Sequence, residues 1–103
     1  MPSGRKLRLT SETRDDLRDV LHYRIETWGR RQRATYKARI LRTLRELARC
    51  PGLGRERHEL GDDIRSFPVG QHLIVYRQDD KELIVIRIMH SRMDVEDDLD
   101  TSG

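Results

Sequence analysis

The stretch IRSFPVGQHLIVYRQDDKELIVIRIMH, residues 64–90, decides the fold, because its apolar and polar residues alternate with a period of two. Such alternation is typical of half-buried β-strands. Strands are expected at residues 64–69, 72–77 and 82–90, and QDDK (78–81) has an ordinary length for a hairpin turn. The stretch therefore predicts a three-stranded antiparallel meander.

Two details refine this meander. Pro68 has no backbone N–H to donate, so it should lie at a sheet edge or a bulge. The last strand is apolar on both faces, which predicts a central strand that is covered on both sides. Its expected faces are Ile84, Ile86, Ile88 and His90 on one side, and Leu83, Val85, Arg87 and Met89 on the other.

The residues before the meander predict a strand and two helices. RKLRLT (5–10) alternates as a short strand, and Thr10 or Ser11 is suited to cap a helix. Apolar residues then recur at helical spacing on both sides of Gly29, where the first helix should stop, and the second should end at CPGLG (50–54). The apolar positions are Leu17, Val20, Leu21, Ile25 and Trp28, followed by Ala34, Ala38, Ile40, Leu41, Leu44, Leu47 and Ala48.

This order of elements predicts an α+β fold: a strand, a two-helix antiparallel hairpin, and then the meander, with the helices packed on one face of the sheet. RERHELGDD (55–63) is expected to be a loop. The 103 residues suffice for a single domain, with a core at about 5–94 and flexible ends at 1–4 and 95–103.

The composition suggests either partly disordered ends or a surface that expects a partner. Hydrophobic residues make up only 35% and charged residues 38%, with a net charge of +3. The single cysteine, Cys50, excludes an internal disulfide, and no stretch resembles a membrane span or a signal peptide. We therefore expect a cytoplasmic protein. The sequence has no phosphate loop or zinc-ligand spacing, so no cofactor or metal is expected.

The second helix is the most basic segment. Its eight cations face a single acid, Glu46, which favours a surface for phosphates or for an acidic partner, with Arg42 and Arg45 among its residues. The alternative is a solvated helix face whose long side chains cover the edge of the core. The cations are Arg30, Arg31, Arg33, Lys37, Arg39, Arg42, Arg45 and Arg49.

The late strands carry further candidates. Arg65, Arg77 and Arg87 lie on or beside them and are suited to clamp a phosphate. Arg87 could equally form a structural ion pair, with Glu59, Asp62, Asp63 or the C-terminal acids as its partner.

The end of the last strand carries a histidine. His90, near Arg92 and Asp94, is suited either to general acid–base chemistry or to capping the strand. His22 and His58 are interpreted as structural or solvated, Cys50 as packing, and Tyr76 as a general base only if its phenol were perturbed.

Residues 51–94 resemble the second half of the RelE/ParE toxin superfamily, and the ParE branch most closely. The most specific features are RSFPVG (65–70) and the ending HSRMD (90–94), while LTSETRDDLRDVLHYRIETWG (9–29) is similar in layout to the first helix. The resemblance implies the toxin of a type II toxin–antitoxin pair, which inhibits DNA gyrase as a binder rather than an enzyme. It also implies a ParD-like antitoxin whose C-terminal segment wraps the toxin.

Two alternatives remain open. RelE-like relatives cleave messenger RNA on the ribosome, and Arg65 and His90 match positions that serve catalysis in some of them, although no tyrosine follows Tyr76. A module that binds DNA through the basic helix is the third possibility, but the resemblance makes direct nucleic-acid binding unexpected. The candidate partner-binding residues are Arg65, Arg77, Arg87, His90, Arg92, Arg42 and Arg45.

Overall fold

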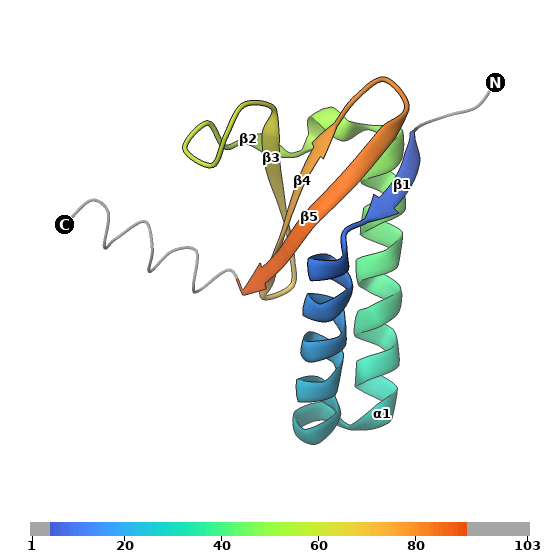
Figure 1. The fold of residues 1–103 in the computed structure, drawn as a ribbon. Coiled ribbons are helices and arrows are strands. Elements are labelled where there is room, and N and C mark those ends of the chain that lie inside the picture. The colour runs from blue at the N-terminus through green and yellow to red at the C-terminus, as the bar shows by residue number, and fades with distance from the viewer. Residues whose placement is uncertain (1–4, 91–103) are drawn as a thin grey trace.

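The computed structural model describes residues 5–90, apart from the side chains of residues 23–28. A short strand, a long helical element and four further strands follow one another along the chain (Figure 1). The elements are β1 (Lys6–Leu9), α1 (Ser11–Arg49), the 3₁₀ turn η1 (Pro51–Leu53), β2 (Arg55–Glu56), β3 (Ile64–Val69), β4 (His72–Gln78) and β5 (Glu82–His90). The predicted α+β fold is confirmed.

Helix α1 is a hairpin of two helical halves. Thr10 caps it, because its side-chain oxygen accepts a hydrogen bond from the Thr13 backbone N–H at 3.1 Å. The chain reverses at Gly29, whose φ of 85° and ψ of 176° are not helical. The second half ends at Arg49, directly before Cys50 and Pro51. The predicted cap and both helix ends are thus confirmed.

The sheet has five strands in the order β1-β5-β4-β3-β2. Strands β3, β4 and β5 form the predicted antiparallel meander. β1 pairs with β5 in parallel, which places β5 inside the sheet and makes the sheet mixed. The two-residue β2 lies in the segment that was expected to be a loop, and a strand this short shows no alternation in the sequence. Because β2 pairs only with Arg65 and Ser66, Pro68 lies on an open stretch of β3, as predicted.

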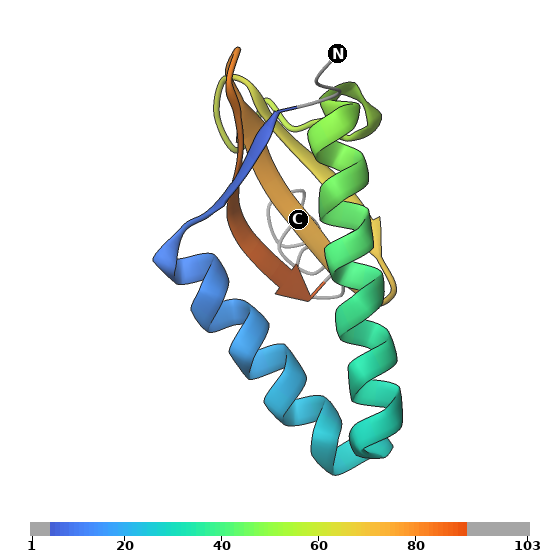
Figure 2. The ribbon, with the colours of Figure 1, turned by 90° about the vertical axis from the view of Figure 1, so that its right-hand side faces the viewer.

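The two halves of α1 meet at the Gly29 turn and splay apart toward the sheet (Figure 2). Their inner side covers the sheet face that carries Ile74, Tyr76 and Val85, all fully buried. From α1, the core receives Tyr36, Ile40, Leu44, Leu47 and Ala48. Ala34 and Ala38 were expected in this row but are exposed, because the buried side of the helix runs through Tyr36 and Ile40 instead.

A β-bulge in β5 changes the predicted faces of that strand. The pairing moves from Val75 opposite Arg87 to Tyr76 opposite Val85, so Ile86 is an extra residue in β5. The alternation therefore reverses at Ile86, and Val85 and Ile88, which were predicted on opposite faces, are both buried against the helices. The predicted set of Ile84, Ile86, Ile88 and His90 on one face is wrong for this reason.

Candidate functional site

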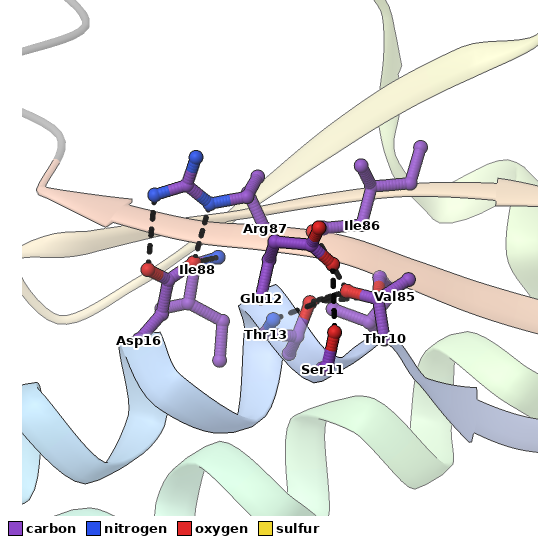
Figure 3. A network of polar contacts seen from close by, with 9 residues as sticks. All are labelled: Thr10, Ser11, Glu12, Thr13, Asp16, Val85, Ile86, Arg87 and Ile88. Carbon is purple, nitrogen blue, oxygen red and sulfur yellow. Dashed lines mark hydrogen bonds and ion pairs between the residues drawn. The ribbon is translucent and has the colours of Figure 1, made fainter.

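The first turns of α1 close the free edge of β5 (Figure 3). β1 pairs only with residues 82–85, so the backbone of β5 beyond Val85 has no strand on that side. Thr13 donates its hydroxyl proton to the Val85 carbonyl at 2.7 Å, and the Thr10 hydroxyl donates to the Ile86 carbonyl at 3.0 Å. Asp16 accepts a hydrogen bond from the Ile88 N–H at 3.0 Å. Three side chains of α1 thus replace a missing strand at the bulge.

Arg87 is held in the same network. Its guanidinium forms a two-pronged ion pair with Asp16, with Nε–Oδ2 and Nη2–Oδ1 distances of 2.7 and 3.0 Å. The hydrogen bond that Arg87 donates to the Asp16 carboxylate raises the pKa of Arg87 above its ordinary value. The partners proposed for Arg87 among Glu59, Asp62 and Asp63 were therefore wrong. Asp16 lies 71 residues away in the sequence, and only the fold brings it to β5.

Arg65 lies on β3, on the other side of β4 from Arg87. Its Nη1 donates to the Gly54 carbonyl at 2.8 Å, and its Nη2 lies 3.2 Å from a Glu56 carboxylate oxygen. His58 pairs with the same carboxylate at 2.8 Å. The group borders a small polar cavity of about 240 Å³. The cavity is lined by Glu56, His58, Asp63, Ile64, Arg65 and Gln78.

Tyr76, opposite Arg65, has a structural role. Its phenol is fully buried, accepts a hydrogen bond from the Gly54 N–H at 2.9 Å, and donates to the Pro51 carbonyl. Burial raises the pKa of Tyr76 above its usual value, so it remains protonated at neutral pH. The phenol fastens η1 to the sheet and is not poised to act as a base.

His90 belongs to a cluster that the sequence did not reveal. Its ring lies edge-on to that of His72, with 5.3 Å between the ring centroids. The Tyr36 hydroxyl donates to the Val69 carbonyl at 3.0 Å and lies 2.6 Å from His72 Nδ1. Because the phenol has one proton, a Tyr36 hydroxyl that donates to the Val69 carbonyl requires His72 to donate from Nδ1. The sequence signals were that His72 opens one strand and His90 closes the next, with the register unknown, and that Tyr36 precedes Ile40 by one helical turn.

The structure does not bring Arg65 and His90 together. Arg65 pairs with Tyr76 and His90 with His72, so four residues of β4, about 13 Å, separate their registers. Arg77 is exposed beside a cavity of about 140 Å³ that Asp62, Asp63 and Asp79 also line. Arg92 lies outside the described residues. No cluster of three or more metal-ligating side chains occurs within the part of the chain that the structure describes.

The second half of α1 carries an open groove. The groove, of about 500 Å³, is bounded by Tyr36 and by the cationic side chains of Arg31 and Arg39. Gln32 and Thr35 complete its lining. Arg42 and Arg45 are exposed further along the same helical half. Among the described residues, no helix is long and apolar enough to span a membrane.

Comparison with known proteins identifies the family. The family of the ParE toxin of type II toxin–antitoxin systems, parDE, matches residues 7–95. Toxin ParE1 of Caulobacter vibrioides is 30% identical over 86 residues, which cover 84% of this chain and 88% of that protein. Toxin ParE1 of Mycobacterium tuberculosis is 29% identical over 84 residues, covering 81% and 86% of the two chains.

Solved structures show the same fold. A chain of the chromosomal ParDE toxin–antitoxin system of P. aeruginosa superposes with a TM-score of 0.73 at 16% identity, covering 86% of this chain and 98% of that one. A chain of the RelBE2 toxin–antitoxin complex of Mycobacterium tuberculosis gives 0.58 at 24% identity, covering 84% and 98%. Fold, family match and relatives agree, and the chain belongs to the ParE toxin family of type II toxin–antitoxin systems.

Proposed function

We propose that this toxin acts in the cytoplasm by binding and inhibiting DNA gyrase, and that a ParD-like antitoxin neutralises it. Membership of the ParE family supports the target. The observation that carries the proposal is the separation of Arg65 from His90, about 13 Å along β4, because a ribonuclease needs its acid, base and phosphate-binding cations around one phosphate.

The contacts of these two residues also favour a binder. The Arg65 guanidinium is already engaged by the Gly54 carbonyl and Glu56. His90 lies against His72, whose ring is fixed by Tyr36. Tyr76, a further candidate base, is buried and keeps its proton. Each group is thus committed to holding the fold together.

The groove on α1 suits the antitoxin. Arg31 and Arg39 border it, and buried Tyr36 forms part of its lining, so it offers both charge and a ring to an acidic segment with apolar anchors. A segment that folds on binding gains affinity from such anchors and loses part of it to the entropy cost of becoming ordered. The low apolar content of this chain agrees with a surface that a partner completes.

The target is tested by expressing the full chain in bacteria and following DNA, RNA and protein synthesis by labelled precursors. We expect DNA synthesis to stop first, with messenger RNA intact. Early arrest of protein synthesis, with messages cut at defined sites and cutting lost in Arg65→Ala or His90→Ala, would instead establish the RelE-like ribonuclease.

The antitoxin is tested by co-expression with the small open reading frame beside the toxin gene. Growth should be restored, and the complex should unfold at a higher temperature than the toxin alone, because a ligand that binds only the folded state stabilises it. The double substitution Arg31→Glu/Arg39→Glu should weaken the complex in calorimetry, whereas Arg14→Glu/Arg18→Glu, on the first helical half, should not. Equal affinities for both variants would place the antitoxin elsewhere.

A further inference from the structure

The second half of α1 presents a row of arginines that make no ion pair with the residues that the structure describes. We define the basic stripe as Arg31, Arg42, Arg45 and Arg49, all exposed. Helical spacing of 100° per residue places these four within a sector of about 60°, on the side opposite the buried row of Ile40 and Leu44. The stripe spans 19 residues, from Arg31 to Arg49, or about 27 Å of straight helix.

The cations of the stripe are not neutralised within the described residues. None of the four guanidiniums forms an ion pair or a side-chain hydrogen bond there, in contrast to Arg57, Arg65 and Arg87. The only acid between residues 30 and 49 is Glu46. Four solvent-exposed guanidiniums in a row, without an acidic partner among the described residues, produce a concentrated positive potential.

We propose that the basic stripe binds the phosphate backbone of duplex DNA. Guanidinium groups match phosphate oxygens with two parallel hydrogen bonds, and all four cations are arginine rather than lysine. Duplex DNA carries one charge per roughly 1.7 Å of its axis, so a straight row of cations about 27 Å long meets phosphates in any register. The contact reads no bases and is independent of sequence.

The chemistry of the face argues against two other occupants. An acidic peptide needs apolar anchors, and beyond the groove beside Arg31 and Tyr36 the uncharged side chain on this face of the helix is the small Ala38. The large exposed apolar residues of the described chain, Leu53 and Leu60, lie outside α1. Single-stranded nucleic acid needs aromatic rings for stacking, and Tyr36 is turned into the core.

This proposal departs from the sequence-based expectation that the toxin does not bind nucleic acid directly. Composition alone showed many cations, but acids of the folded protein were available to pair with them. The structure pairs Asp15, Asp16, Glu56 and Glu59 with other arginines or histidine, and leaves the stripe without a partner among the described residues. The inference concerns DNA alone and does not depend on gyrase being the target.

The test measures binding of the full chain to a fluorescent 20-base-pair duplex of arbitrary sequence by anisotropy, over a series of salt concentrations. Four phosphate contacts predict a slope of log K against log salt of about −3.6. Arg42→Gln/Arg45→Gln/Arg49→Gln should reduce the slope to about −0.9. Lys6→Gln/Arg14→Gln/Arg18→Gln removes the same charge from exposed positions outside the stripe and should leave the slope near that of the parent.

Circular dichroism confirms that both variants are folded. Equal losses in the two variants would show that net charge, and not the stripe, holds the DNA, and would overturn the proposal. A flat salt dependence would also overturn the proposal, as would displacement of the duplex by a polyglutamate peptide at equal charge concentration. The experiment contains no gyrase, so a negative result for DNA binding would not count against gyrase as the proposed target.

Discussion

At the scale of single residues, the structure depends on buried polar groups whose partners are distant in the sequence. Thr13 is fully buried, and its hydroxyl reaches a β5 carbonyl 72 residues away. Tyr76 fastens η1 from β4 in the same manner. The sequence showed that Thr10 could cap a helix, because that contact is local. It could not show that Thr13 or Asp16 would serve β5, since nothing in the local pattern encodes a contact of that range.

Thr13→Val removes the buried hydroxyl and leaves the Val85 carbonyl without that donor. We expect the free energy of unfolding to fall by about 1–3 kcal/mol. The measurement is urea denaturation followed by circular dichroism. Thr35→Val is the matched control, because its hydroxyl bonds within an exposed helical turn, and it should change stability by at most about 0.5 kcal/mol. Indistinguishable midpoints for the two variants would rule out the assigned role of Thr13.

Tyr76 also predicts how stability responds to alkaline pH. Burial raises the pKa of its phenol in the folded state above the unfolded value of about 10, so the folded state holds the proton more tightly. The stabilising effect is therefore complete below the unfolded pKa and is lost as the pH rises through the folded pKa. Tyr76→Phe should flatten the fall in melting temperature above about pH 10 while lowering stability at neutral pH. An unchanged alkaline profile in this variant would contradict the assignment.

At the scale of elements, strong local patterns in the sequence were sufficient to predict the helices and the main strands, but irregularities within those elements could not be predicted. The three strands of the meander and both ends of the helical halves follow from alternation, Gly29 and Pro51. The bulge at Ile86 does not, because an extra residue inside a mostly apolar strand leaves no mark in its pattern. Strand β2 is too short for any pattern, and parallel pairing of β1 with β5 depends on the path of the whole chain.

The reversal inside α1 requires a glycine. At Gly29, φ of 85° with ψ of 176° is a backbone conformation that is essentially restricted to glycine. A Cβ added there meets no atom within 4 Å, so substitution should act through the backbone alone. Gly29→Ala should lower the free energy of unfolding by about 1–3 kcal/mol. Gly52→Ala, equally open but without a positive φ, is the control and should have a smaller effect; equal losses would argue against strain at Gly29.

At the scale of the whole molecule, the sequence named candidate residues but could not give their neighbours. Arg65, Arg87 and His90 were all candidates, but the fold places them on different strands or at different registers and gives each its own partner. Groups that alternation places on strands meet only if the register allows it, and register was not available from the sequence. The Tyr36–His72–His90 cluster was missed for the same reason.

The distribution of charge is also a property of the whole molecule. The first half of α1 directs Asp16 to β5, whereas the second half carries nearly all of its cations outward. The first half of α1 is therefore engaged with the edge of the sheet, whereas the outward face of the second half is available to partners. A toxin that binds its target without chemistry needs a surface of the second kind.

The most direct measurement of the central claim is a supercoiling assay with purified gyrase, relaxed plasmid, ATP and increasing amounts of the full-length toxin. The account predicts that supercoiling falls with toxin concentration and returns when the antitoxin is added in equal amount. Complete supercoiling at saturating concentrations of folded toxin would contradict it.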